Sequence, residues 1–293
     1  MDGVLVVDKP AGITSHDVVD RVRRLANTRK VGHLGTLDPM ATGVLPLVVG
    51  RATRLAQFFS ASEKEYDGRI CFGWATDTYD RDGTAAGAAV APRFTREQLE
   101  EALAQFQGTI LQTPPPFSAK KIAGTPAYKL ARKQIAVTLE PVEVQVHALE
   151  LLEFDGTRAR VRVRCSAGTY LRSIAHELGQ RLGCGAFLEE LRRTVSGEFS
   201  EKDAHTFEEL EKLAGDGRLQ EAVIPASRVL PQIPCATVDQ LTAGQIRQGK
   251  DFRLSPFSGR ARGQYVKAIG PDGDLVAIGE ARLPHVYHPI LVL

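Results

Sequence analysis

The segment Gly32-His33-Leu34-Gly35-Thr36-Leu37-Asp38-Pro39-Met40-Ala41-Thr42-Gly43 separates two stretches of the chain that have regular hydrophobic patterns. Its glycines and its proline disfavour both helix and strand, so we expect it to form a loop. The apolar run from Val44 to Val49 follows it directly and is typical of a buried strand. The sequence therefore predicts a polar loop, carrying His33 and Asp38, that is held between packed elements.

The residues before this loop predict a strand followed by a helix. Val4 to Val7 form a short apolar run, and the turn Lys9-Pro10-Ala11-Gly12 ends it. Thr14 and Asp17 have the spacing of a capping box, and apolar residues recur after them at helical intervals. The loop is therefore expected to follow a strand and a helix that starts near residue 15.

The residues after the loop predict further helices and strands. Thr95 and Gln98 form a second capping box, and Gly168-Thr169 leads into a helix with an apolar stripe. Apolar and polar residues alternate at 142–146 and at 159–165, which is the period of half-buried strands.

Four arginines share one face of the strand expected at 159–165. An alternating row of cations can follow the phosphates of RNA, but it is also typical of a solvated strand face. Both interpretations stay open for Arg158, Arg160, Arg162 and Arg164.

The C-terminal part of the chain predicts a small, mostly β module. A capping box at Thr206 and Glu209 predicts one more helix, and prolines at 225, 231 and 234 mark a boundary after it. The tail then predicts a helix over 238–246 and three short strands. Those strands are expected at 265–269, 275–278 and 289–293.

Composition and motifs exclude several classes of protein. The chain has 293 residues, a formal net charge of +2 and 25% charged residues, as in an ordinary globular protein of about two domains. Its four cysteines form no C-x-x-C pair, so we expect buried, reduced thiols and no metal site. Asp251 follows the partial P-loop Gly244-x4-Gly249-Lys250, where a Ser or Thr is needed, and His176-Glu177 lacks the second histidine of a zinc protease. The N-terminus has no signal-peptide pattern and no apolar run is long enough to span a membrane, which predicts a cytoplasmic protein.

Three residues are candidates for chemistry, and each has a structural alternative. Asp38 in its loop could approach a ligand closely, although Asp before Pro is a common turn residue. Arg172 is expected in the first turn of its helix, where it could bind a phosphate or a carboxylate or simply face solvent. Tyr66 could stack on a base or pack within a sheet.

Taken together, these segments resemble the TruB-type bacterial tRNA pseudouridine synthases. The segment from Pro114 to Arg132 also resembles the tRNA-contacting insertion of that family. The resemblance rests on three motifs in the family's order: Asp8-Lys9-Pro10-Ala11-Gly12-Ile13-Thr14-Ser15, the block from Gly32 to Pro39 that continues to Leu45-Pro46, and Cys165-Ser166-Ala167-Gly168-Thr169-Tyr170-Leu171-Arg172-Ser173.

The resemblance implies the fold and its division. It implies an α+β catalytic domain at 1–230, in which helices flank a central mixed and mostly antiparallel sheet. A tRNA-contacting insertion is expected at about 112–140, and a PUA-like RNA-binding domain at 234–293.

The resemblance also implies roles for individual residues. Asp38 lies on the family's essential aspartate, Tyr66 on the tyrosine that stacks on the target base, and Arg172 on the arginine near the aspartate. These three are expected to be catalytic. Substrate-binding roles are expected for His33, Gly35, Thr36, Leu191, Tyr170, Lys9, Lys120 and Lys121.

The implied reaction converts uridine 55 in the T loop of tRNA to pseudouridine. The N1–C1′ bond breaks and a C5–C1′ bond forms without redox change or hydrolysis, so no metal or other cofactor is expected. The base must first be flipped out of its stack. Attack at C1′, addition at C6 and a glycal route stay open, and either Tyr66 or Asp38 could remove the C5 proton.

The expected partner is the T-stem-loop of tRNA, with no membrane and no guide RNA, and the enzyme is expected to be a monomer. A non-catalytic RNA-binding protein on the same scaffold is one alternative. A glycosidase-like enzyme is another, but the Asp38 motif contains no second acid for it.

Overall fold

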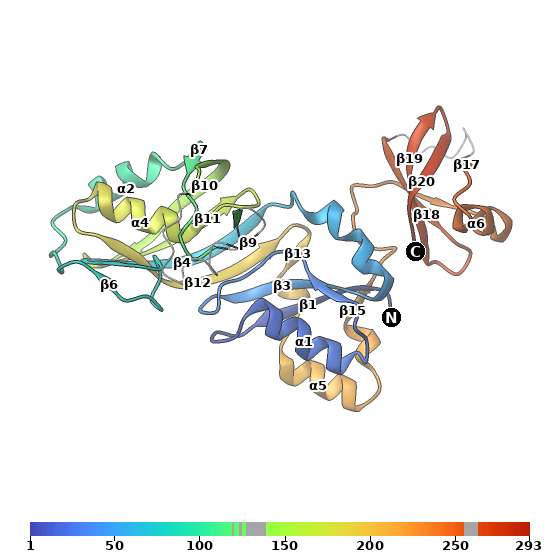
Figure 1. Ribbon diagram of the computed structural model, residues 1–293, viewed down its shortest axis with the longest axis horizontal. Helices are drawn as coiled ribbons and strands as arrows, with labels where there is room; N and C mark the ends of the chain where they lie inside the picture. The colour runs from blue at the N-terminus through green and yellow to red at the C-terminus, as the bar shows by residue number, and fades with distance from the viewer. Residues whose placement is uncertain (119, 123–124, 127–138, 255–262) are drawn as a thin grey trace.

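The computed structural model describes residues 1–118, 120–122, 125–126, 139–254 and 263–293, with the backbone alone described at 121, 122, 125 and 126. Within these residues the chain forms a large mixed sheet and a separate five-stranded sheet near the C-terminus (Figure 1). The long axis of the molecule runs from α2 and α4 at one end to the C-terminal sheet at the other. The strands of the large sheet are β1 (Gly3–Lys9), β2 (Val31–His33), β3 (Thr42–Val49), β4 (Lys64–Phe72), β7 (Gly108–Gln112), β10 (Val142–Phe154), β11 (Arg158–Cys165), β12 (Ala186–Ser196), β13 (Phe199–Ser200), β14 (Ala204–His205) and β15 (Val223–Pro225).

The described part of the large sheet has the order β14-β1-β3-β12-β4-β11-β10-β7. Two of its pairings, β1 with β14 and β3 with β12, are parallel, and the others are antiparallel. The expected α+β class with a mixed, mostly antiparallel sheet is therefore confirmed. The helical segments of this part are α1 (Ser15–Leu25), α2 (Arg96–Ala104), α4 (Leu171–Arg181) and α5 (Phe207–Gly215), together with the 3-10 segments η1 (Gly50–Phe59), η2 (Glu201–Asp203) and η3 (Leu219–Ala222).

Each predicted capping box is present at the start of its helix. The hydroxyls of Thr14, Thr95 and Thr206 accept the backbone N–H three residues later and start α1, α2 and α5. Such a cap contributes about 1 kcal/mol to a helix because it satisfies a free N–H. The apolar stripes of these helices and of α4 pack on the sheet in one core.

The sheet differs from the prediction in length and in number of elements. β10 continues eight residues beyond the expected end at 146, because it pairs with β11 as far as Phe154. η1 and β12 were not predicted, since neither has a simple hydrophobic period. Two short hairpins, β5 (Ala75–Thr76) with β6 (Ala85–Ala86) and β8 (Lys121–Ile122) with β9 (Thr125–Pro126), lie outside the sheet.

The C-terminal module has its own sheet and its own core, as expected from the tail. Its elements are β16 (Cys235–Thr237), α6 (Gln240–Arg247), β17 (Phe252–Arg253), β18 (Tyr265–Ile269), β19 (Leu275–Leu283) and β20 (Val286–Val292), in the sheet order β16-β18-β19-β20-β17.

The 3-10 segment η1 contacts this module, and it shares with β1, β3 and the module one buried apolar cluster. Arg54 donates a hydrogen bond to the Val292 carbonyl, and the Phe58 ring packs edge-on against Tyr265 at 5.9 Å. Ala56 and Phe59 of the same segment line a cavity that is also lined by Asp38. One short segment therefore contacts both the module and the cavity.

The cysteines follow the prediction only in part. Cys71, Cys165 and Cys184 are buried free thiols, as expected, but Cys235 is exposed at the edge strand β16, so the prediction was wrong for this residue. Among the described residues, no helix is long and apolar enough to cross a membrane.

Candidate active site

The loop from Leu34 to Ala41 is held in place by buried polar side chains. Ser15, at the start of α1, donates its hydroxyl to the Leu37 carbonyl and accepts the Leu37 N–H, at 3.0 and 2.8 Å. The Arg193 guanidinium, from β12, donates to the carbonyls of Gly35 and Val44 at 3.1 and 2.7 Å. A loop without regular structure satisfies its carbonyls in this way, so its backbone is fixed.

Lys9 also holds this loop, through hydrogen bonds to backbone carbonyls. Its side chain is fully buried and donates to the carbonyls of Pro10, Pro39 and Ala41, which uses all three protons of the ammonium group. Burial lowers the pKa of Lys9 to about 8. Lys9, expected from the motif to bind substrate, therefore lies under the loop and not along the cavity.

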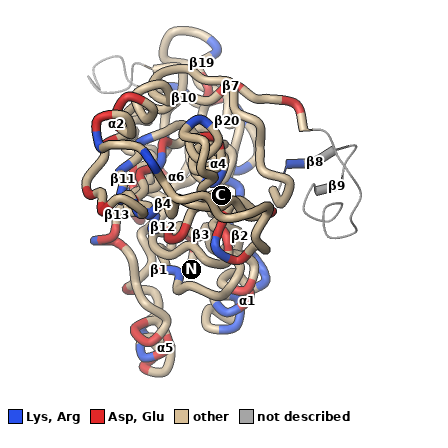
Figure 2. The backbone as a smooth tube through the Cα atoms, turned by 90° about the vertical axis from the view of Figure 1, so that its left-hand side faces the viewer, with Lys and Arg blue, Asp and Glu red and all other residues tan. Residues whose placement is uncertain are grey.

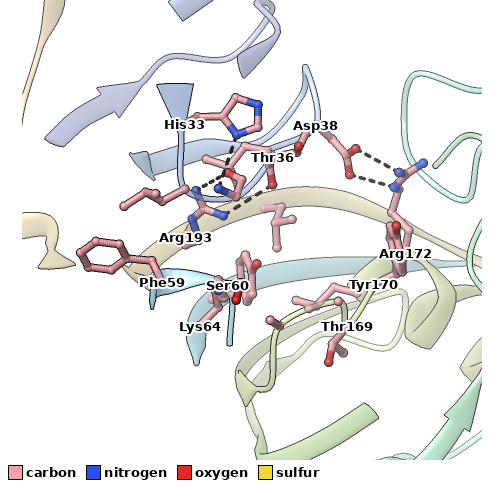
Figure 3. Close-up of a pocket in the computed structure, with 18 of the residues that line it drawn as sticks. His33, Thr36, Asp38, Phe59, Ser60, Lys64, Thr169, Tyr170, Arg172 and Arg193 are labelled. Atoms are coloured by element: carbon pink, nitrogen blue, oxygen red, sulfur yellow. Dashed lines mark hydrogen bonds and ion pairs between the residues drawn. The ribbon is translucent and has the colours of Figure 1, made fainter. Parts of the chain in front are cut away.

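Asp38 and Arg172 form a paired contact at one side of the cavity (Figure 3). Arg172 is the second residue of α4, as predicted. Its Nε lies 2.9 Å from Asp38 Oδ2, and its Nη2 donates to Oδ1 at 3.0 Å. The Arg172 side chain is 4% exposed while that of Asp38 is 31% exposed. The carboxylate is thus fixed in direction by the guanidinium but remains open on its other side.

Asp80 is a second carboxylate on the same arginine that the sequence analysis did not identify. Its Oδ2 lies 3.4 Å from Arg172 Nη1, and the Thr78 carbonyl accepts from the same nitrogen at 3.1 Å. Burial raises the pKa of Asp80, against the lowering effects of the Thr78 hydroxyl and the Arg172 charge. Asp80 is not among the residues that line the cavity, so it does not form with Asp38 the open carboxylate pair that a glycosidase needs.

Tyr66 forms the floor of the cavity. It lies on β4, opposite Arg193 of β12, and only 9% of it is exposed. Burial raises the pKa of its phenol, although the nearby Arg193 charge acts in the opposite direction. Leu191 lies on the same face of β12, two residues before Arg193, and adds an apolar wall.

Three basic side chains, Lys64, Arg193 and His33, lie at the side of the cavity away from Arg172. Lys64 at the start of β4 is nearly buried and donates to the Ser62 carbonyl. Burial, and the charge of Arg193 after it, lower the pKa of Lys64 to about 8. Burial and the same arginine also lower the pKa of His33, which accepts the Gly35 N–H at 3.4 Å. His33 is therefore neutral at pH 7.

The cavity has a volume of about 440 Å³ and brings together most of the predicted site. Figure 3 shows Asp38 and Arg172 at one side and His33, Lys64 and Arg193 at the other. Of the predicted residues, it is lined by His33, Gly35, Thr36, Asp38, Tyr66, Tyr170, Arg172 and Leu191.

Two of the predicted substrate-binding residues remain, Lys120 and Lys121. Lys120 is exposed and does not line the cavity. The side chain of Lys121 and much of the expected insertion at 112–140 lie outside the described residues. Their predicted contacts with RNA stay predictions.

The opposite face of the same strands carries charges in a different arrangement. The four arginines of β11 lie there, and each is within 4 Å of an acid, as with Arg158 and Glu189 at 3.0 Å and Arg160 and Asp67 at 2.8 Å. Arg162 also reaches Asp67, at 3.9 Å, and Arg164 reaches Glu63 at 3.8 Å. Acidic and basic positions are interspersed around β4, β11 and β12 in Figure 2. These pairs favour the interpretation of a solvated strand face.

Comparisons with known sequences agree on one family. The family model described as TruB family pseudouridylate synthase (N terminal domain) matches residues 23–171, and the tRNA pseudouridylate synthase B C-terminal domain matches 172–231. The chain is similar to the tRNA pseudouridine synthase B of Solibacter usitatus, with 58% identity over the whole of both chains. It is also similar to that of Aquifex aeolicus, with 40% identity over 96% of each.

Comparisons with solved structures agree with the sequence matches. A Cbf5-Nop10-Gar1 complex contains a chain with a TM-score of 0.71 and 30% identity, which covers 95% of this chain and 78% of that one. A chain from an H/ACA RNP bound to a substrate RNA containing 2′-deoxyuridine has a TM-score of 0.70 and 28% identity over the same shares. The chain therefore belongs to the TruB family, and its activity is that of a pseudouridine synthase.

Proposed function

We propose that this chain converts uridine 55 in the T loop of tRNA to pseudouridine, with Asp38 as the catalytic carboxylate. The observation that carries the proposal is a single cavity lined by Asp38, which Arg172 orients, and by Tyr66. The name tRNA pseudouridine synthase B, shared by the relatives, supports tRNA as the substrate.

Asp38 acts on the nucleotide after it leaves its stack. Flipping a base out costs a few kcal/mol, which contacts with the protein must offset. The Tyr66 ring offers one stacking surface, and Leu191 offers apolar contact to the edge of the base. The Arg172 guanidinium pairs with the Asp38 carboxylate and fixes its direction, and the carboxylate can act as a nucleophile or as a base.

The rest of the molecule binds the RNA around the flipped nucleotide. We propose residues 1–230 as the catalytic domain and 234–293 as a PUA-like RNA-binding domain. The insertion at about 112–140, with Lys120 and Lys121, would contact the T-stem-loop. In this proposal the enzyme is a cytoplasmic monomer that finds its target without a guide RNA.

The decisive experiment measures both the loss of the C5 hydrogen and the position of the pseudouridine in the RNA. The purified chain is incubated with a T-arm RNA labelled with tritium at C5 of uridine, tritium release is measured, and the product is mapped by mass. We expect one tritium released per RNA and pseudouridine at position 55. An RNA with cytidine at that position should give neither.

Asp38→Asn is the matched control because it keeps the size of the side chain and removes its charge. We expect release to slow at least about 1000-fold, which is about 4 kcal/mol of lost transition-state stabilisation, with RNA affinity within about tenfold. Binding without any tritium release by the wild-type chain would indicate a non-catalytic RNA-binding protein, and free uracil as the product would indicate a glycosidase. Substantial turnover by the variant would remove Asp38 from the mechanism.

A further inference from the structure

The loop that delivers Asp80 to Arg172 is attached to α4 by an aromatic stack. Tyr79 lies directly before Asp80, and its ring lies parallel to the His176 ring, with centroids 3.7 Å apart and an interplanar angle of 11°. His176 is four residues after Arg172 on α4, so both side chains lie on one face of the helix. The loop therefore meets α4 at two points one turn apart.

The backbone of Tyr79 has a conformation that needs support. Its φ of +65° is in the left-handed region, which costs a residue with a side chain about 1 kcal/mol or more. The Tyr79 carbonyl accepts the Leu188 N–H at 3.0 Å, and its N–H donates to the Thr76 carbonyl at 3.3 Å. The stack and these hydrogen bonds together hold the turn.

This turn supplies both groups that contact one nitrogen of the guanidinium, Nη1. Thr78 and Asp80, the two neighbours of Tyr79, both contact Arg172 Nη1, through a carbonyl and a carboxylate. Asp80 is itself fixed, because its carboxylate accepts from the Thr78 hydroxyl at 2.6 Å and from the Asp82 N–H at 3.1 Å. Nη1 is occupied from this side, while Nε and Nη2 contact Asp38 and Nη2 also donates to the Phe117 carbonyl at 3.0 Å.

The surroundings of the His176 ring are those of a side chain that packs against its neighbour. Its Nε2 lies 2.9 Å from the Gln180 amide nitrogen, while its buried Nδ1 has no hydrogen-bond partner among the described residues. Burial lowers the pKa of the ring, so it is neutral at pH 7. The ring lies with its face on the Tyr79 ring, so the two rings remove apolar surface from water and make close dispersion contacts.

We propose that Tyr79 and His176 are positioning residues of this pseudouridine synthase, whose stack sets Asp80 and the Thr78 carbonyl against Arg172 and so orients Arg172 toward Asp38. The inference rests on the proposed role of Asp38. Tyr79 and His176 do not line the cavity, so in this proposal they affect the rate of the reaction only through Arg172.

Single variants test whether the stack affects chemistry. Tyr79→Asn removes the ring but keeps a residue type that tolerates a positive φ, and His176→Ala removes the other ring. We expect kcat to fall about tenfold in both, with KM within about twofold. Tyr79→Phe and His176→Phe keep a stacking ring and should stay within about twofold of the wild-type kcat.

A double-mutant cycle tests whether the stack acts through Asp80. Asp80→Asn keeps the shape of the side chain and removes its charge. In the Asp80→Asn background we expect Tyr79→Asn to lower kcat less than about twofold, because the group it positions no longer carries charge. Equal losses in both backgrounds, or an unchanged kcat in Tyr79→Asn and in His176→Ala, would overturn the inference.

Two measurements keep the outcomes distinct. Urea unfolding of each variant establishes that it is folded, and if Tyr79→Asn is not, His176→Ala with the same cycle carries the test. A wild-type chain that releases no tritium from the T-arm RNA would contradict the proposed function, whereas an active wild-type chain with unaffected variants would contradict this inference alone.

Discussion

The two faces of β4, β11 and β12 use arginine in opposite ways. On the cavity face, Arg193 is 1% exposed and its donors are spent on loop carbonyls, while on the outer face Arg162 and Arg164 are about half exposed and lie near acids. A buried guanidinium cannot return to water when a partner is lost, but an exposed one can. The difference teaches that burial, more than charge, decides which arginines hold the site together.

Replacing Arg193 should give the largest effect on stability. Arg193→Met keeps most of the side-chain volume but removes the donor to the buried Val44 carbonyl and to the half-buried Gly35 carbonyl. We expect the free energy of unfolding to fall by about 3 to 5 kcal/mol. Urea unfolding checks this through a lower midpoint at an unchanged m-value.

The matched variant for Arg193 is Arg193→Lys, which keeps the charge but has one nitrogen in place of three. It should lie between the wild type and the methionine variant. A loss below about 1 kcal/mol in Arg193→Met would mean that the loop is held without it, and the contrast between the two faces would fail.

A change of pH should give a smaller effect, through Lys64 on the cavity face. Its pKa of about 8 means that it is charged at pH 7 and neutral at pH 9. RNA held near Lys64 prefers the charged form, so the dissociation constant should rise about three- to tenfold between these values. Binding is measured with the Asp38→Asn variant to prevent turnover.

Lys64→Arg serves as the control for the pH series, because an arginine stays charged throughout this range. Its dissociation constant should not show the rise. If the two profiles have the same shape, the titrating group is not Lys64.

The outer face should give the smallest effect. Changing Arg162 and Arg164 together to alanine removes two exposed cations, and we expect the free energy of unfolding to change by less than about 1 kcal/mol. RNA affinity should stay within about twofold, with the same dependence on salt. A salt slope reduced by about 2 would show that these arginines meet phosphates, and that this face also binds RNA.

The sequence predicted the site better where a motif is continuous along the chain. The loop with Asp38, the floor at Tyr66 and the helix start at Arg172 were predicted from local patterns and a family resemblance, and the structure places all three around one cavity. Capping boxes were equally reliable, because a cap depends only on residues three positions apart.

The missed residues depend on contacts between distant segments. Asp80 lies in the turn-rich stretch 76–84, and nothing local shows that Arg172 reaches it across 92 positions of the chain. Arg193 and Lys64 had a weak signal that could have been used, since each is a charged residue at an inward-facing position of a strand. Lys9 shows the opposite error, because a lysine in a functional motif was expected at the substrate but supports the backbone.

The 3-10 segment η1 fixes a spacing in the molecule. Because Arg54 and Phe58 touch the C-terminal module while Phe59 lines the cavity, the module and the chemical centre cannot shift apart without breaking contacts of the same ten residues. If RNA contacts both the C-terminal module and the cavity, as proposed, then η1 fixes the distance between the two contacts, and an RNA with a different spacing makes only one of them.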